Sequence, residues 1–408
     1  MSNRREKRIS LLEMTENFLT YQAQTSPNPL KLQIKRAMGS YIYDKDDKPY
    51  LDFIAGVSAN TLGHQPSKVK EAIKAQLDTY MHVMVYGEFI QAPQLDLCRF
   101  LADKLPAALN CTYLTNSGTE ATEGAIKLAK RVTGRFEIIA AKNAYHGNTQ
   151  GAMSICGKGE QINAFRPLVP GVKFIEFNKE SDLENISEQT AAVVLETIQG
   201  GAGFIVPQND YLKKVKKKCD EVGALLVLDE IQSGIGRTGH LFGFENFDVI
   251  PDILIAGKGL GGGMPIGAFI SSKELMESLK EKPKLGHITT FGGHPVIAAA
   301  ALANLQQLYE LKLMESIKKK EELMRSNLTH PSIKEIRGSG LMLALIFEDS
   351  DIVNYIIHQG LKKGLILFWL LYEPKAVRIT PPLNISEEEI IAGCSIINNL
   401  LQEYVVND

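Results

Sequence analysis

The middle of the chain repeats one pattern: a short apolar run, a polar or glycine-rich loop, and an amphipathic stretch with helical spacing, as in residues 119–131 and 209–222. Short, nearly continuous apolar strands that alternate with helices are typical of a mainly parallel sheet with helices on both faces. We therefore predict an α/β fold. The predicted strands are residues 111–114, 136–140, 191–195, 224–228, 253–256 and 265–271. Ligands of such sheets bind beyond the carboxyl ends of the strands, so these ends and the loops after them are candidate site positions.

The length of the chain, 408 residues, predicts more than one domain, because a single hydrophobic core stops growing near about 250–300 residues. We assign residues 76–300 to a large domain that holds the sheet. Residues 39–53 have the pattern of a small hairpin, and residues 301–408 combine a long helical pattern with further short strands. Residues 1–75 and 301–408 are therefore predicted to form a smaller α+β domain.

The composition excludes several classes of protein. A formal net charge of -2 provides no basic field for nucleic acid, and the lysines within residues 213–218 are expected on a solvated helix face. No apolar stretch approaches the roughly 18 residues that span a bilayer, and the run at residues 9–14 is too short for a signal-peptide core. The 5 cysteines are scattered and lack C-x-x-C spacing. We therefore expect reduced thiols, no metal site, no membrane or nucleic-acid partner, and a cytoplasmic location.

A loop at residues 115–120, with the sequence TNSGTE, joins a predicted strand to a predicted helix. Small hydroxyls and a glycine at a helix N-terminus favour phosphate, because free backbone N–H groups and the helix dipole both attract an anion. The same residues are compatible with a plain N-cap at Ser117 or Thr119. The loop alone leaves both interpretations open.

Two charged residues end predicted buried strands. Asp229 follows the apolar run LLVL, where a carboxylate is costly unless it meets a cation or hydrogen-bond donors. A pyridinium nitrogen is one such partner, because an ionised carboxylate keeps the ring protonated; a helix N-cap is the alternative. Lys258 follows the run ILIAG and precedes a glycine-rich segment. A partly desolvated lysine loses its proton more easily, as a Schiff-base lysine must.

Residues 257–262, with the sequence GKGLGG, also match the G-x-G-x-x-G fingerprint of dinucleotide-binding proteins. That fingerprint requires a helix directly after the glycines. The sequence MPIG at residues 264–267 instead predicts a new strand. We therefore reject the dinucleotide interpretation.

The phosphate loop, an aromatic-His-Gly loop at residues 145–147, Asp229 and Lys258 follow one another on successive predicted strands. With these motifs the sequence resembles the class III (ω-) aminotransferases, in the branch that contains ornithine and acetylornithine aminotransferases. The resemblance runs from about residue 29 to residue 389. It implies a fold type I transferase that depends on pyridoxal 5'-phosphate (PLP).

The resemblance also implies roles for individual residues. Lys258 matches the lysine that holds the cofactor as a Schiff base, and Asp229 matches the acid at the ring nitrogen; these two are the implied catalytic residues. Thr290 matches a threonine that reaches the phosphate of the neighbouring subunit's cofactor, which implies a homodimer with active sites at the interface. The implied cofactor-binding residues are Ser117, Gly118, Thr119, Tyr145, His146, Glu196, Asp229, Gln232, Lys258 and Thr290.

The implied substrate site departs from the ornithine-type pattern. Arg378 matches the arginine that grips a substrate carboxylate, as a bidentate guanidinium suits. Asn148 stands where the family has a second carboxylate-binding arginine, and Gly201 stands where it has a glutamate that masks the first. Thr197 and His294 replace the usual proline and asparagine of two further motifs. We therefore expect intact cofactor chemistry, altered substrate choice, and poor use of acetylornithine.

The implied function is a ping-pong transamination from an amino acid or ω-amine donor to a 2-oxo acid acceptor, both small molecules. A decarboxylating aminotransferase or an aminomutase on the same scaffold is the alternative. A non-catalytic PLP-binding regulatory protein would tend to lose Lys258, which is present. Trp369 and Tyr372 are expected in the core or cleft wall rather than in a substrate cage.

Overall fold

A seven-stranded sheet forms the centre of the computed structural model, which describes residues 11–407. The strand order is β4-β10-β9-β8-β7-β5-β6, and every pair is parallel except the two pairs made by β10. The strands are β4 (Cys111–Thr115), β5 (Glu137–Ala141), β6 (Val172–Ile175), β7 (Thr190–Glu196), β8 (Leu225–Asp229), β9 (Ile253–Gly257) and β10 (Gly267–Ser271). The predicted α/β fold with a mainly parallel sheet is confirmed, and β6 is a strand that the prediction missed.

The antiparallel direction of β10 follows from the short connection that precedes it. Only residues 258–266 link β9 to β10, and they form the 3-10 helix η4 (Lys258–Gly261) followed by a turn at Gly262, whose φ is +58°. A parallel crossover needs a dozen or more residues. The chain therefore returns beside β9 in the opposite direction, and the dinucleotide-binding helix that we rejected is absent from this segment of the described chain.

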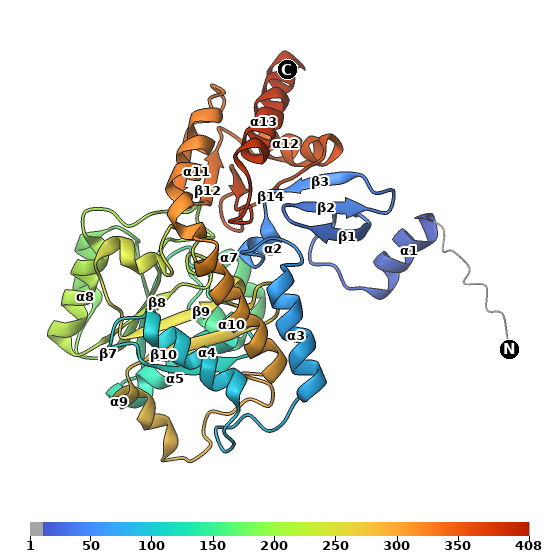
Figure 1. The fold of residues 1–408 in the computed structure, drawn as a ribbon. Helices are drawn as coiled ribbons and strands as arrows, with labels where there is room; N and C mark the ends of the chain where they lie inside the picture. Colours follow the sequence, from blue (N-terminus) through green and yellow to red (C-terminus); the bar gives the residue numbers. More distant parts are fainter. Residues whose placement is uncertain (1–10, 408) are drawn as a thin grey trace.

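Side chains on the strands alternate between two apolar layers. Leu254 and Ala256 of β9 pack into the cluster that includes α4, α8 and α10, whereas Ile253 and Ile255 pack against α5. This period of two is that of a sheet buried on both faces. Figure 1 shows helices on both sides of the sheet. These helices are α4 (Ala92–Lys104), α5 (Gly118–Thr133), α8 (Tyr211–Val222) and α10 (Pro295–Glu310).

The two ends of the chain meet in one small sheet. Strand β13, from the C-terminal part, pairs in parallel with β3 of the N-terminal hairpin, so the order is β1-β2-β3-β13. His64 contacts the end of β3, because its Nε2 lies 2.8 Å from Oδ2 of Asp52. The strands are β1 (Ile34–Met38), β2 (Tyr41–Asp44), β3 (Pro49–Asp52) and β13 (Leu365–Ile366).

A second small sheet, with the order β11-β12-β15-β14, is antiparallel throughout. It lies at the top of Figure 1 with the helices α11, α12 and α13. Its strands and helices are β11 (Glu335–Ser339), β12 (Met342–Ile346), β14 (Phe368–Trp369), β15 (Ala376–Ile379), α11 (Leu313–Asn327), α12 (Ser350–Lys363) and α13 (Glu387–Asn407). Helix α3 (Ser67–Thr79) packs on α10 and runs through residue 75 without a break. The predicted division at residues 75 and 300 stays a prediction.

The remaining helices are short, apart from the N-terminal helix α1. They are α1 (Leu11–Tyr21), α2 (Ala55–Ser58), α6 (Gln150–Ser154), α7 (Gly159–Ile162), α9 (Lys273–Met276) and the 3-10 helices η1 (Asn163–Phe165), η2 (Glu180–Asn185), η3 (Gly243–Phe247) and η5 (Glu277–Lys280). None of the helices described for residues 11–407 has the length and apolar character that a membrane crossing requires.

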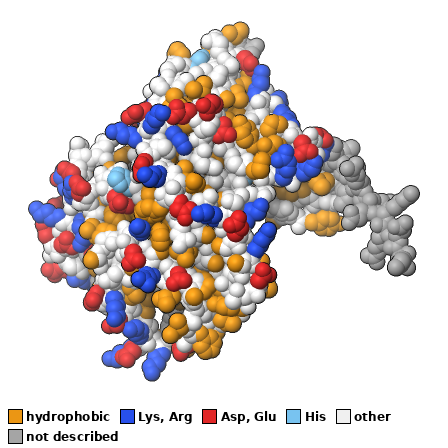
Figure 2. Space-filling view, viewed as in Figure 1, with side chains coloured by type: hydrophobic (Ala, Val, Ile, Leu, Met, Phe, Trp, Pro, Cys, Tyr) orange, Lys and Arg blue, Asp and Glu red, His pale blue; other side chains and the backbone are white. Residues whose placement is uncertain are grey.

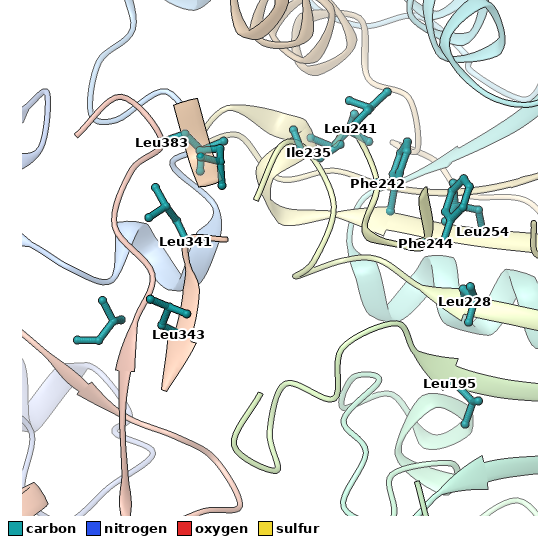
Figure 3. Packing of buried hydrophobic residues seen from close by; sticks show 14 of the residues in the cluster. Leu195, Leu228, Ile235, Leu241, Phe242, Phe244, Leu254, Leu341, Leu343 and Leu383 are labelled. Carbon is teal, nitrogen blue, oxygen red and sulfur yellow. The ribbon is translucent and has the colours of Figure 1, made fainter. Parts of the chain in front are cut away.

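The loop after β8 joins the large sheet to the antiparallel sheet. Arg237 in this loop is fully buried and donates from Nη1 to the carbonyl oxygens of Leu341 and Pro381. Figure 3 shows Leu341 and Leu343 across from Ile235, and all of these residues belong to one apolar cluster. The position of β15 relative to the large sheet therefore depends on buried contacts rather than on a flexible linker.

Charged side chains of both signs are interspersed on the visible face of the molecule in Figure 2. The lysine-rich helix α8 follows this pattern. Lys213 lies within 4 Å of Asp210 and Asp248, and Lys214 lies 2.7 Å from Glu180. These contacts fit the predicted solvated helix face.

Replacement of Gly124 by alanine tests how α5 packs on the sheet. A Cβ at Gly124 would overlap the ring of Phe269 on β10. Overpacking of this kind costs about 1–3 kcal/mol, which outweighs the roughly 1 kcal/mol that alanine gains over glycine in a helix. We expect Gly124→Ala to lower the urea midpoint of unfolding. Gly159→Ala is the control, because nothing lies within 4 Å of that Cβ position; equal midpoints for the two variants would contradict this account.

Candidate active site

A cavity of about 640 Å³ opens at the carboxyl ends of the parallel strands, where residues of β14 and β15 face the large sheet. Most of the site residues predicted from the sequence line it. Those residues are Gly118, Thr119, Tyr145, His146, Asn148, Glu196, Gly201, Asp229, Gln232, Lys258 and Arg378. Ser117 and Thr290 do not line it.

The start of α5 forms one end of the cavity. Ser117 has extended backbone angles and its Oγ accepts the N–H of Glu120 at 3.4 Å, so it acts as the N-cap that we considered as an alternative. The first N–H groups of a helix have no partner within the helix, and Gly118 and Thr119 carry two of them at the cavity. This end therefore suits an anion such as a phosphate group.

Gly147 brings the aromatic-His-Gly loop against the start of α5. Its φ is +129°, and a Cβ at this position would overlap Oγ1 of Thr119. Oγ1 of Thr119 also lies 2.9 Å from Oγ1 of Thr149 and accepts the N–H of Thr149 at 3.2 Å. Only glycine allows this approach, which positions Tyr145 at the cavity beside the anion-binding end.

Asp229 lies at the end of β8 with donors on both oxygens. Nδ1 of His146 lies 2.7 Å from Oδ2, and the N–H of Ile231 donates to Oδ1 at 3.0 Å. Burial lowers the pKa of His146, but its hydrogen bond to Asp229 and the charge of Asp229 outweigh this effect and raise that pKa. His146 thus holds the orientation of a carboxylate that lines the cavity.

Glu196 ends the neighbouring strand β7 and ties two loops together. Its Oε2 accepts the N–H of Tyr145 at 3.1 Å, and its Oε1 accepts the N–H of Gly200 at 2.9 Å. Burial raises the pKa of Glu196 to about 7. Gln232 lies beside it, and a Cβ at Gly200 would come within 2.7 Å of Oε1 of Gln232. The buried Nε2 of Gln232 has no hydrogen-bond partner among the described residues, so it remains available to a ligand.

Lys258 follows β9 directly and has a φ of +39°, an unfavourable backbone conformation for a residue with a side chain. Burial and the like charge of Arg378 lower the pKa of Lys258 to about 8, although Asp229 and Glu196 act in the opposite direction. A lysine with this pKa has far more neutral amine near neutral pH than a lysine with the ordinary pKa of 10.5. It can therefore act as a nucleophile and as a proton carrier.

Arg378 lies on β15, on the side of the cavity formed by the antiparallel sheet. It is 6% exposed, and its Nε and Nη1 have no hydrogen-bond partner among residues 11–407. Burial lowers its pKa to about 10, so the guanidinium still carries its charge at neutral pH. A buried cation with free donors is a binding site for a carboxylate.

Two predicted departures from the family pattern lie at the cavity. Asn148 is exposed and lines it. A Cβ at Gly201 would meet Cδ2 of Tyr372 at 2.9 Å, and the N–H of Tyr372 donates to the carbonyl oxygen of Gly201 at 2.9 Å. The ring of Tyr372 thus occupies the direction in which a side chain at position 201 would extend.

The sequence prediction missed part of the cavity wall. Val57, Ile198, Ile231 and Ser233 line the cavity, as does the segment of residues 368–371. Ile231 and Ser233 flank Gln232 in the motif that follows Asp229, so their place in the cavity wall could have been predicted from the sequence. Phe368, Leu370 and Leu371 gave no signal, because an apolar run of this kind has the same pattern in a core. Trp369 lies in the cleft wall, as we expected.

These residues fit a flat cofactor that carries a phosphate. They combine an anion-binding helix start, a carboxylate with fixed orientation, an unpartnered amide donor and a lysine of lowered pKa around one cavity. Residues 11–407 contain no group of three His, Cys, Asp or Glu side chains that could hold a metal ion.

Comparisons with known proteins agree with this geometry. The family described as Aminotransferase class-III matches residues 21–401. The acetylornithine aminotransferase of Caldanaerobacter subterraneus subsp. tengcongensis is 36% identical, with 92% of this chain and 96% of that protein covered. The Bacillus subtilis acetylornithine aminotransferase is 37% identical over 91% of this chain and 96% of its own length. A structure of the Toxoplasma gondii ornithine aminotransferase, which has PLP at partial occupancy in its active site, has a TM-score of 0.90 and 30% identity and covers 97% of this chain and 95% of its own.

The pKa of Lys258 can be tested on the cofactor-free protein by reductive methylation at a series of pH values, followed by mass spectrometry. A protonated amine does not react, so the rate should rise with pH around a midpoint near 8, well below the ordinary 10.5. Arg378→Gln should move this midpoint upward, because it removes a like charge. Arg337→Gln removes an arginine that is paired with Glu335 and should leave the midpoint unchanged. A midpoint near 10.5 in the unaltered protein would contradict this account of the site.

Proposed function

The chain belongs to the class-III aminotransferases and is a PLP-dependent transaminase, and we propose that the cavity around Lys258 is its active site. The observation that carries this proposal is the placement of Lys258, Asp229 and the unpartnered Arg378 around one cavity. The reaction moves an amino group from a small-molecule donor to a 2-oxo acid acceptor. The relatives' names suggest acetylornithine or ornithine as the donor. Asn148 and Gly201 weaken that assignment for this chain.

The proposed cofactor contacts follow the geometry of the cavity. The start of α5, at Gly118 and Thr119, binds the phosphate, and Tyr145 supplies an aromatic face for the ring. Asp229 pairs with the ring nitrogen, while Gln232 donates from its free Nε2. When bound, PLP supplies an electron-withdrawing ring that accepts the electron pair released at the substrate carbon.

Lys258 carries two proposed roles at its Nζ. The amine, with its pKa lowered to about 8, attaches the cofactor as a nucleophile. Once a donor has replaced it there, the same Nζ takes the proton from the reacting carbon of the substrate and later returns a proton. The alternatives of decarboxylation and aminomutase chemistry would use the same lysine, so the products distinguish them.

Asp229 keeps its orientation through His146, which is why we propose His146 as a positioning residue rather than a catalytic one. The hydrogen bond of 2.7 Å between His146 and Asp229 fixes the orientation of the carboxylate, which lines the cavity. Glu196 fixes the loops of Tyr145 and Gly200 through backbone N–H groups. Arg378 provides the carboxylate grip for substrates.

The variant Lys258→Ala tests the proposed function directly. It should lose the visible absorbance of the lysine-bound cofactor and lower turnover by several orders of magnitude, because nucleophile and proton carrier are removed together. Lys217→Ala, on the exposed face of α8, serves as the control. Amino transfer to a 2-oxo acid, followed by chromatography of both products, is the measurement. Near-normal transamination by Lys258→Ala would refute the proposed function.

The homodimer is proposed from the surface around Thr290. Thr290 is exposed and outside the cavity of its own chain. Exposed apolar side chains lie on its loop and on the segment of residues 81–90. These two segments are in contact, because the ring centroids of His82 and Phe291 lie 4.9 Å apart. These side chains are Met81, Val83, Met84, Phe89, Ile90, Ile288 and Phe291. An exposed apolar patch of this kind marks an interface, and a second copy of the chain would bring Thr290 to its cofactor phosphate.

Ile90→Asp tests this interface, because Ile90 is 92% exposed in the single chain. We expect the variant to sediment as a monomer and to lose cofactor on dilution, since binding and assembly are linked. Ile250→Asp alters another exposed loop isoleucine and should remain dimeric with cofactor bound. A monomer that retained the cofactor at full affinity would contradict the role of Thr290. The predicted cytoplasmic location stays a prediction.

A further inference from the structure

We infer that the cavity selects donors and acceptors that carry one carboxylate and an apolar side chain. This inference rests on the proposed function and names its substrate class. Three features of the cavity carry it: a single free cation, a blocked side-chain direction at Gly201, and an apolar wall.

Arg378 is the one arginine among the described lining residues, and the other basic side chains there are Lys258 and His146, of which His146 is paired with Asp229. Lys258 is committed to the cofactor in the proposed function. Nε and Nη1 of Arg378 remain without partners, so Arg378 can take one carboxylate with charge-assisted hydrogen bonds. Asn148 offers only an uncharged amide for a second carboxylate.

Tyr372 blocks the side-chain direction at position 201. Its ring lies 2.9 Å from the position of a Cβ on Gly201, and its backbone N–H is bonded to Gly201. It also packs edge-on against Tyr145, with ring centroids 6.5 Å apart. A glutamate at position 201 would have to displace this ring before it could mask Arg378. The carboxylate grip is therefore available in both half-reactions.

An apolar wall completes the cavity. It consists of Val57 and the segment of residues 368–371. Phe368 and Leu371 are 41% and 50% exposed, so their apolar surface is available to a ligand. The indole N–H of Trp369 donates to Oδ1 of Asn354 at 2.8 Å and offers no donor toward the cavity. A second carboxylate placed against this wall would lose water without gaining a partner.

The expected substrates follow from these contacts. An amino acid with an apolar side chain gives its amino group and becomes the corresponding 2-oxo acid, and an acceptor of the same class, such as 4-methyl-2-oxopentanoate, becomes the amino acid. Glutamate and 2-oxoglutarate, which carry a second carboxylate, are disfavoured. A charge-assisted hydrogen bond accounts for roughly 10- to 150-fold in affinity.

Binding can be measured without turnover, because Trp369 is the single tryptophan of the chain. The cofactor-loaded enzyme is titrated with 4-methylpentanoate or with glutarate, neither of which has an amino or oxo group, and Trp369 fluorescence is recorded. We expect glutarate to bind at least about tenfold more weakly than 4-methylpentanoate. Equal or tighter binding of glutarate would overturn the inference, since a second cation, from this chain or from a neighbouring copy, would then serve the cavity.

A gain of binding provides the second measurement. Leu371→Arg adds a cation to the apolar wall at an exposed position, and it should tighten glutarate binding about tenfold or more while weakening that of 4-methylpentanoate. Leu311→Arg changes a leucine of similar exposure, 52%, outside the cavity and should change neither affinity. No tightening in Leu371→Arg would count against the apolar wall as the selective element. Lys258→Ala turnover is a separate test, so failure of the proposed function and failure of this inference give different results.

Discussion

A carboxylate at the end of a buried strand costs free energy unless donors surround it, and the surroundings of Asp229 meet this requirement. His146 lies 2.7 Å from one oxygen, and the N–H of Ile231 donates to the other. The contact with His146 ties the loop after β5 to the end of β8. Tyr145 and Gly147 belong to the same loop, so this buried pair helps to hold them at the cavity. Removal of His146 would leave Oδ2 of Asp229 buried without this donor, and removal of Asp229 would leave Nδ1 of His146 buried without a partner.

The part of the cavity around Thr119 and Lys258 depends on close approach of the backbone and on an unfavourable backbone conformation. Gly147 lies against Thr119 where no side chain would fit, and Lys258 has a positive φ at the end of β9. Unfavourable backbone conformations persist only where surrounding contacts impose them, and they gather at functional sites. The short connection between β9 and β10 imposes the positive φ of Lys258, because the chain must turn within residues 258–266 while Lys258 stays at the cavity.

The positions that depart from the family pattern have local partners of their own. Thr197, in place of a proline, donates from Oγ1 to Glu230 at 2.6 Å. Gly201 is covered by Tyr372. These contacts show that the substrate side is packed as consistently as the cofactor side, with Arg378 left unpartnered. We therefore expect the altered residues to change which ligand fits while the cavity stays intact.

The sequence by itself determined the α/β class, most strands of the large sheet, and the positions of Asp229 and Lys258, because apolar periodicity and strand ends are local properties of the chain. Only the tertiary structure decided the edge strand β6, whose short, half-buried pattern is weak, and the pairing of β13 with β3. It also decided that Ser117 caps α5, that Tyr372 covers Gly201, and that residues 368–371 face Lys258. The pairing of β13 with β3 and the contact of Tyr372 with Gly201 join residues more than a hundred positions apart, so no local pattern encodes them.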